Sequence, residues 1–349
     1  MKAFYFKHVL KFKTPGWTSR GVLNDKESWF IVIADQKKFG VGECSLIKGL
    51  SPDPVMGFEK KLEEICAEIK SGFEVLEKKL NDFPAILFGL ETAFNSFYSK
   101  NPFVFTNSKL QNGKDHININ GLIWMGKKSF MQDQIKEKIE SGFNCIKIKV
   151  GSLDFNQECD ILKNIRSKYS SDDIEIRLDA NGAFSFKSAI KKLKILSGFG
   201  IHSIEQPIAV NQWEEMAFLC KNSPIKIALD EELIGLNSAL EGEKMLKKIC
   251  PQFIIIKPSL LGGIKKSESW IKLAESQKIK WWCTSALESN IGLNAIAQWI
   301  YSRKEMNIQG LGTGGLFTNN ISCPCYISNG KLKYNPKISW DIKLFKNYG

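Results

Sequence analysis

Histidine and arginine are scarce in this chain. The 349 residues include three histidines, His8, His116 and His202, and none follows an apolar run that reads as a strand. This disfavours a histidine base, and we assign all three to structural or surface positions. Only four of the 49 basic residues are arginine, and the lysines are spread through predicted helices. The net charge of +12 therefore indicates a solvated lysine-rich surface without a nucleic-acid partner, although its field would attract a small anionic substrate.

Long apolar runs, paired cysteines and nucleotide-binding loops are also missing. No segment approaches the ~20 apolar residues of a membrane span, and the start, MKAFYFKHVLKFKTPGW, lacks the apolar core of a secretory signal. We therefore expect no membrane partner and a cytoplasmic location. The nine cysteines contain no CxxC pair, which indicates reduced and mostly buried thiols. No Walker motif is present, and no GxGxxG follows a strand.

The two ends of the chain differ in pattern from its middle. Residues 1–105 begin with strand-like runs (AFYFKHVLKF, SWFIVIAD, FGVGECS) and continue with helical ones (FEKKLEEICAEIKSG, PAILFGLETAFNSFYSK). Strands followed by helices predict an α+β domain. Residues 319–349 have a turn-punctuated β pattern with an Asn-Gly turn signal. We expect this tail to leave the middle domain and to pack back on the first domain.

Residues 115–318 alternate short apolar runs with amphipathic helical segments. This alternation predicts parallel βα units, and eight units predict closure into a TIM-like (β/α) barrel. An open doubly wound sheet is the alternative. The eight expected strands are 117–122, 145–150, 174–180, 201–206, 225–231, 253–258, 280–285 and 308–313.

Five charged residues recur at nearly even intervals along this domain. Each stands at or just past the end of an apolar run, and the intervals are 30, 26, 25 and 27 residues, about one βα unit. Strand ends of a barrel converge on one face, so the spacing predicts three carboxylates and two amines around one point. The five are Lys149, Asp179, Glu205, Asp230 and Lys257.

The three carboxylates suit a hard divalent cation. With no histidine or cysteine nearby, oxygen-only ligands favour Mg²⁺, which takes few protein carboxylates and leaves positions for substrate oxygens. Asp179, Glu205 and Asp230 are the predicted ligands. We favour Asp230 over Glu231 because strand alternation lets only one of them face inward.

The lysines suit proton transfer. Lys147 and Lys149 are two apart on an apolar strand and therefore share a face. Each amine raises the cost of protonating the other, so one can act as a base near neutral pH. Lys257 follows four apolar residues and is expected across the cavity from Lys149. Asn181, two residues after Asp179, faces the same way.

The order of short motifs resembles a known family. KIKV, DANGAF, IEQPI, LDEEL, IIIKPSLLGG and TSALESNIGL resemble the enolase superfamily, in particular its muconate-lactonizing subgroup. The resemblance implies a modified barrel with an N-terminal capping domain that the C-terminal tail completes. It maps Mg²⁺, with Mn²⁺ as a substitute, onto Asp179, Glu205 and Asp230. It maps the acid/base pair onto Lys149 and Lys257.

Within the subgroup the chain is most similar to the o-succinylbenzoate synthases of menaquinone synthesis. The INGLIW segment, TSALESNIGL and the length carry this resemblance. It implies a lyase that removes a proton α to a carboxylate and then eliminates water. Dipeptide epimerases of the subgroup carry a DxD pair at the eighth strand, where this chain has Gly312-Thr313-Gly314. An N-acylamino acid racemase or dipeptide epimerase is the alternative.

Substrate specificity is expected from the capping domain. The turn-rich segments 15–22 and 46–53 are candidate covers of the site. Arg20 could meet a substrate carboxylate, and Lys147, Asn181, Ser285 and Gly312 are further substrate-binding candidates. Glycines near 312 favour a close backbone approach to substrate over phosphate binding. Glu288 is either a site residue or the cap of the next helix. The oligomeric state is left open.

Overall fold

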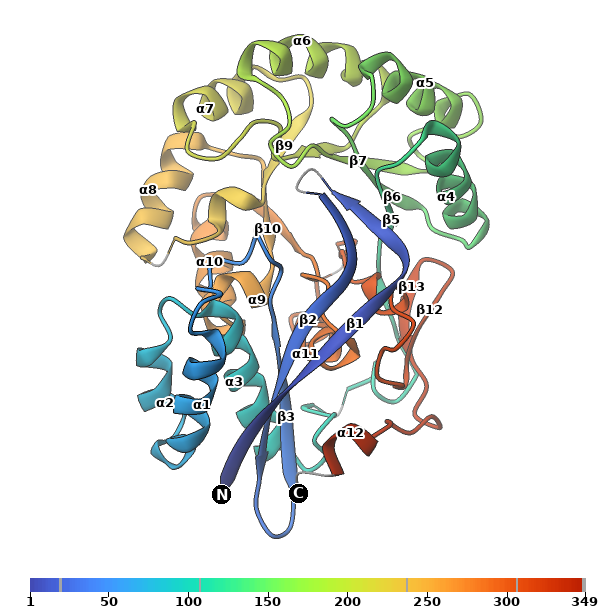
Figure 1. Ribbon diagram of the computed structural model, residues 1–349. Coiled ribbons are helices and arrows are strands. Elements are labelled where there is room, and N and C mark those ends of the chain that lie inside the picture. The colour runs from blue at the N-terminus through green and yellow to red at the C-terminus, as the bar shows by residue number, and fades with distance from the viewer. Residues whose placement is uncertain (19–20, 107, 237, 306, 347–349) are drawn as a thin grey trace.

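A curled parallel sheet with helices outside it forms the larger part of the computed structural model, and an antiparallel sheet with its own helices packs beside it (Figure 1). The structure describes residues 1–18, 21–106, 108–236, 238–305 and 307–346. None of the helices in these ranges is long and apolar enough to cross a membrane.

The N-terminal part is an antiparallel sheet in the order β1-β2-β3, covered by helices. Alternation along β2 separates two apolar layers. Ile31 and Ile33 pack on the helices, whereas Phe30 and Val32 face the C-terminal tail. A Cβ on Gly42 would lie 1.9 Å from the Gly89 carbonyl, so this glycine lets α3 lie directly on β3. The elements are β1 (Lys2–Thr18), β2 (Gly21–Ala34), β3 (Phe39–Ser45), α1 (Phe58–Ala67), α2 (Phe73–Leu76) and α3 (Pro84–Tyr98).

Seven parallel strands follow in chain order around the larger sheet, from β5 to β11. In its register Lys149 pairs with Asp179 and Asp179 with Glu205, so the predicted charged residues are neighbours across strands. The strands are β5 (Gly121–Ile123), β6 (Cys145–Lys149), β7 (Glu175–Asp179), β8 (Ser203–Glu205), β9 (Lys226–Leu229), β10 (Phe253–Ile256) and β11 (Lys280–Cys283).

The expected first and eighth strands are shorter than the pattern suggested. Segment 117–122 splits into β4 (Ile117–Asn118) and β5, and only β5 joins the parallel sheet. Segment 308–313 forms only two parallel bridges, Gln309 with Ile119 and Gly310 with Thr284. These bridges join the two ends of the sheet. Glycines in the eighth segment weaken a regular strand, and a Cβ on Gly310 would lie 2.4 Å from the Thr284 hydroxyl.

Helices connect the strands and cover the outer face of the sheet, with α4 to α8 forming an arc in Figure 1. Four begin with a side-chain cap, from Asp154, Ser185, Ser238 and Ser289, as their sequences indicate. Their bounds are α4 (Lys128–Glu140), α5 (Phe155–Arg166), α6 (Phe186–Leu196), α7 (Trp213–Asn222), α8 (Ala239–Ile249), α9 (Pro258–Leu261), α10 (Ile264–Ser276) and α11 (Asn290–Ser302).

The C-terminal tail contacts both parts of the molecule. Strands β12 (Cys325–Ser328) and β13 (Lys331–Tyr334) form a hairpin, and β13 pairs with β4. Asn329 and Gly330 turn this hairpin with φ of 52° and 63°, as an Asn-Gly turn allows. Further on, Trp340 and Phe345, the latter in α12 (Lys343–Lys346), pack in one apolar cluster with Phe30 of β2. The tail therefore ties the first domain to β4, which directly precedes the parallel sheet.

Candidate active site

The C-terminal ends of the parallel strands carry a dense set of charged side chains. Lys149, Asp179 and Glu205 are the last residues of β6, β7 and β8, while Asp230 and Lys257 directly follow β9 and β10. Asp179, Glu205 and Asp230 are 0–2% exposed. We call these five residues and Lys147 the mouth cluster. The strand register predicted from the sequence therefore brings all six to one face.

Lys147 is the central cation of the mouth cluster. Its Nζ lies 2.8 Å from Asp179 Oδ2 and 2.6 Å from Glu205 Oε2. The side chain is 6% exposed, and a buried ammonium needs such partners. Burial favours the neutral amine, but Asp179, Glu205 and Asp230 outweigh burial and raise the pKa of Lys147 above its ordinary value.

Lys149 and Lys257 stand at opposite ends of the row of carboxylates. Lys149 Nζ lies 2.6 Å from Asp179 Oδ2 and donates to Asn181 Oδ1 at 2.7 Å. Lys257 forms a short ion pair with Asp230 Oδ2. Burial favours the neutral Lys257 amine, but Asp230 and Glu205 raise its pKa above the ordinary value. The strands that supply the carboxylates lie between the two amines, as expected.

Glu231 also reaches the mouth, so the argument that only Asp230 can face inward is wrong. Glu231 opens a short 3₁₀ turn (Glu231–Leu233), which ends the strand alternation. Its Oε1 accepts a hydrogen bond of 2.8 Å from Asn181 Nδ2. Burial, followed by repulsion from Asp230 and Asp179, raises the pKa of Glu231. Glu232 points elsewhere and accepts hydrogen bonds from Trp213 Nε1 and the Asn211 backbone.

The carboxylates of the mouth cluster differ in protonation preference. Burial opposes ionisation of Asp179, but Lys147 and Lys149 outweigh it and hold the pKa of this carboxyl below its usual range. Burial and the neighbouring Asp179 raise the pKa of Glu205 well above its ordinary value. The three carboxylates of the mouth cluster are all paired with its three lysine amines. A divalent cation bound to these oxygens would therefore have to take the place of part of the lysine charge.

The three carboxylates have the chemistry that a hard cation prefers, but their oxygens are not arranged around a single point. In the described part of the chain no three carboxylate, imidazole or thiol groups converge closely enough to hold a metal ion. The Lys147 ammonium lies between Asp179 and Glu205, and Asp230 is held by Lys257. The predicted ligands are thus buried oxygens at three adjacent strand ends, paired with amines instead of converging on one point.

A cavity opens above the mouth cluster. Its space of about 950 Å³ includes the part open to solvent and is lined by Lys147, Lys149, Lys257 and Asn181. A fourth lysine, Lys48, joins them from the N-terminal domain. Of the described residues that line this cavity, none is acidic. Such a cavity suits a small molecule of negative charge.

Both predicted covering segments reach the cavity, although one is largely strand. Residues 15–18 continue β1, and lining residues 21–23 open β2 (Gly21–Ala34). Arg20, predicted to bind a substrate carboxylate, lies outside the described residues. From the second segment, Ile47, Lys48 and Leu50 line the cavity. Asp53 instead accepts from the Ala85 backbone at the start of α3, and burial raises its pKa to about 7.

The other substrate-binding candidates are also near the cavity. Ser285 and Gly312 line it, as does Thr313, whose hydroxyl donates to Ser285 Oγ at 2.7 Å. Glu288 does not cap the next helix, because Ser289 does so. The carboxylate of Glu288 instead lies behind Ser285 and is fully buried. None of the three histidines lines the cavity.

Some lining residues were missed by the sequence reasoning. Asn120 Oδ1 and Thr284 Oγ1 are buried and have no hydrogen-bond partner among the described residues, so each can bond to a bound molecule. Leu122 and Trp124 add an apolar wall. Asn120, Leu122 and Thr284 fall within the expected strands 117–122 and 280–285. Their position near the carboxyl ends of these strands was the signal that could have identified them as cavity-lining residues.

Comparisons with known proteins agree with this architecture. Residues 131–330 match the family model described as Enolase C-terminal domain-like. An o-succinylbenzoate synthase of Desulfotalea psychrophila is 43% identical over 95% of this chain and 98% of its own length. The crystal structure of MenC from the same organism has a TM-score of 0.84 at 40% identity, covering 95% of this chain and 99% of that one.

More distant relatives have other activities. An L-Ala-D/L-Glu epimerase of Francisella tularensis subsp. novicida is 26% identical over 76% of each chain. A muconate lactonizing enzyme of Pseudomonas fluorescens shares the fold with a TM-score of 0.84 at 18% identity, covering 99% of this chain and 98% of that one.

Proposed function

This chain belongs to the enolase superfamily, and we propose that it is a Mg²⁺-dependent o-succinylbenzoate synthase, a lyase of menaquinone synthesis. The observation that carries the proposal is 43% identity along almost the whole length of a relative that is an o-succinylbenzoate synthase. The substrate would be 2-succinyl-6-hydroxycyclohexadiene carboxylate, which loses water to give 2-succinylbenzoate. We also propose that the chain is divided into a capping domain (1–105), a barrel (115–318) and a tail (319–349).

We assign the metal to Asp179, Glu205 and Asp230, with Mn²⁺ as a substitute for Mg²⁺. When bound, Mg²⁺ supplies positive charge that offsets the second negative charge developing on the substrate carboxylate. The Lys147 ammonium binds two of these carboxylates and so competes for the same oxygens. Weakening that ion pair would lower the pKa of Lys147 toward its ordinary value.

Lys149 is the proposed base and acid. Its Nζ takes the proton α to the substrate carboxylate, which leaves an enediolate. The resulting ammonium returns this proton to the departing hydroxide, so water is lost and the ring becomes aromatic. Asn181 accepts from the same Nζ and thereby orients it. Lys257 remains cationic on the opposite side, where its charge stabilises the enediolate.

The cavity lining supports a dianionic, partly apolar substrate. Four lysines line it, and Leu122 and Trp124 offer apolar surface for a ring. The buried oxygens of Asn120 and Thr284, which have no partner among the described residues, can bond to the polar groups of the succinyl side chain or the ring hydroxyl. We propose Ser285 and Gly312, which line the cavity, as substrate-binding residues. Arg20 is proposed to bind a substrate carboxylate from the sequence alone.

Racemisation or epimerisation of acylated amino acids is the second candidate. It needs the same first step, after which Lys257 would deliver a proton to the other face. A free substrate ammonium is disfavoured because no described lining residue is acidic and because Gly312-Thr313-Gly314 replaces a DxD pair. N-acylated amino acids lack that ammonium, so their racemisation stays the second candidate activity.

The decisive assay is direct. The protein is incubated with the hydroxycyclohexadiene precursor and Mg²⁺, and formation of the aromatic product is followed by its ultraviolet absorbance. We expect turnover that disappears with a chelator and returns with Mg²⁺. No turnover, together with fast deuterium exchange into N-succinyl amino acids, would replace the first candidate by the second.

A further inference from the structure

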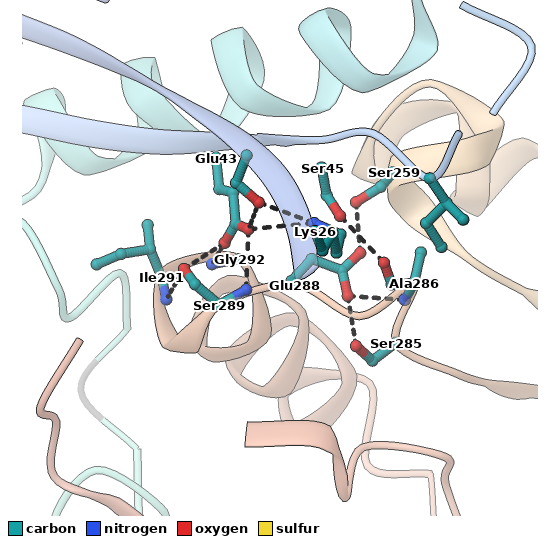
Figure 2. A network of polar contacts seen from close by, with 12 residues as sticks. Lys26, Glu43, Ser45, Ser259, Ser285, Ala286, Glu288, Ser289, Ile291 and Gly292 are labelled. Carbon is teal, nitrogen blue, oxygen red and sulfur yellow. Dashed lines mark hydrogen bonds and ion pairs between the residues drawn. The ribbon is translucent and has the colours of Figure 1, made fainter. Parts of the chain in front are cut away.

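A second group of buried charges lies where the N-terminal domain meets the parallel sheet (Figure 2). It contains Lys26 of β2, Glu43 of β3 and Glu288, which stands between β11 and α11. The two glutamates are 0% exposed and Lys26 is 5% exposed. We call these three residues the junction cluster. None of them lines the cavity.

Glu43 holds the start of helix α11 from the other domain. Its Oε1 accepts from the Ser289 backbone at 2.8 Å, and its Oε2 accepts from Ser289 Oγ and from the Gly292 backbone. Backbone N–H groups at a helix start have no partner within the helix, so an outside carboxylate satisfies them. Ser28 Oγ adds a further donor at 2.8 Å. This glutamate therefore joins the two domains.

Glu288 forms hydrogen bonds with the segment 285–287, which lines the cavity and which we call the cavity wall. Its Oε2 accepts from Ser285 Oγ at 2.5 Å and from the Ala286 backbone at 2.7 Å, while its Oε1 accepts from Ser259 Oγ at 2.5 Å. Ser259 comes two residues after Lys257. One carboxylate thus connects the wall to the segment that carries Lys257, the cation proposed to stabilise the enediolate.

The wall needs such support because its backbone is unfavourable. Leu287 has φ of 60°, a left-handed conformation that costs energy for a residue with a branched side chain. The Ala286 carbonyl accepts from Ser45 Oγ of the N-terminal domain at 3.0 Å. The Ala286 peptide groups are therefore held from both domains at once, its N–H by Glu288 and its carbonyl by Ser45.

Lys26 offsets part of the negative charge of the two glutamates. Its Nζ donates to Ser28 Oγ at 2.8 Å and lies 3.9 Å from Glu43 Oε1. Burial lowers the pKa of Lys26, and the Glu43 and Glu288 carboxylates oppose that shift. Burial raises the pKa of Glu288, as does the Glu43 carboxylate, while the hydrogen bonds from Ser259 and Ser285 oppose that shift.

We propose that Glu288 is a positioning residue, which fixes the cavity wall 285–287 and couples it to the segment behind Lys257. Glu288 does not touch the substrate and acts through the residues that do. The identity of that substrate rests on the proposed function, whereas the support of the wall is a property of the fold.

The test compares Glu288→Gln with Glu91→Gln. In Glu288→Gln the new amide would be nearly the same size as the carboxylate but would replace one acceptor by a donor. Either a serine hydroxyl would have to turn and accept from the amide, or the Ala286 N–H would lose its acceptor. We expect kcat/KM for the dehydration to fall at least tenfold, mainly through KM. Hydrogen exchange of the peptide that spans 285–287 should become at least tenfold faster, with other peptides unchanged.

Glu91 is the matched control because it also joins the domains without reaching this cavity. It accepts from the Ile264 and Lys265 backbones at the start of α10. Glu91→Gln should lower the melting temperature but leave kcat/KM within twofold and leave exchange at 285–287 unchanged. Glu288→Asp keeps the charge and should recover part of the lost kcat/KM.

Ser259→Ala covers the case in which Glu288→Gln fails to fold. This variant removes a single donor to Glu288, and kcat should fall about threefold or more while KM stays within twofold. The proposal is overturned if exchange at 285–287 is unchanged in folded Glu288→Gln, or, where only Ser259→Ala folds, if the kcat of that variant equals that of the wild type. It is also overturned if Glu288→Gln and Glu91→Gln lose activity equally. If the wild-type protein has no dehydration activity, the proposed function fails and the exchange result alone decides.

Discussion

The mouth cluster and the junction cluster both bury carboxylates beside lysine, but the partners that bind these carboxylates differ. In the mouth, Asp179 and Glu205 are bound chiefly by the amines of Lys147 and Lys149. In the junction, Glu43 and Glu288 receive four and three hydrogen bonds from hydroxyl and backbone donors. Backbone and serine donors hold a carboxylate in a structural role, whereas an amine at the end of a flexible lysine side chain can be displaced by a cation or a substrate.

Removal of a mouth lysine should have the largest effect. In Lys149→Ala or Lys257→Ala we expect kcat to fall at least 10³-fold, about 4 kcal/mol in activation free energy, because the base or the charge opposite it is lost. Steady-state dehydration kinetics measure this, and circular dichroism checks the fold. A rate near that of wild type would remove the variant residue from its assigned role.

Matched carboxylate-to-amide changes should separate the two clusters. Mg²⁺ should raise the melting temperature of the wild-type protein and of Glu43→Gln, because a ligand stabilises the state that binds it. Asp179→Asn should lose this rise, together with Mg²⁺-dependent turnover. Glu43→Gln should instead lose about 2–4 kcal/mol of unfolding free energy in urea, since a buried hydrogen-bonded charge is broken. If Asp179→Asn kept the full Mg²⁺ response, the metal assignment would be wrong.

The tight packing of the junction offers a smaller test. A Cβ on Gly292 would lie 2.7 Å from Glu288 Cγ and 3.0 Å from Glu43 Oε2. Gly292→Ala should therefore lower the free energy of unfolding by about 1–3 kcal/mol, as overpacking does. Gly198→Ala is the control, because a Cβ there meets no atom of the described residues within 4 Å. Equal urea midpoints for the two variants would show that the junction is loosely packed.

The pH dependence of stability should be an effect of the same small size. Burial raises the pKa of Glu91 to about 7 from 4.5. The folded state then binds more protons than the unfolded state, so this contribution is complete below pH 4.5 and is lost as pH rises toward 7. Glu91→Gln should flatten the fall in unfolding free energy across this window by about 1–3 kcal/mol. Parallel urea-derived curves for variant and wild type would contradict the assignment.

The sequence predicted the mouth better than the junction for a clear reason. Charged residues at the ends of βα units repeat at a fixed interval, so Lys149, Asp179 and Glu205 could be placed together without coordinates. Family membership and the enzyme class, which were inferred from the resemblance of the ordered motifs, are confirmed by the comparisons. The roles of individual site residues stay predictions. Glu231 was misjudged because a 3₁₀ turn replaces strand alternation after β9.

The local pattern of apolar and charged residues determined the strands, most helices, their caps and the face on which the catalytic candidates lie, because these depend on periods of two and 3.6 residues. Only the tertiary structure decided that Lys26, Glu43 and Glu288 meet, since residues about 245 positions apart carry no shared period. The reduction of the eighth strand to two bridges and the split of the first were likewise decided by contacts with Thr284 and β13. Long-range packing sets which backbone groups find partners, and no local pattern encodes that choice.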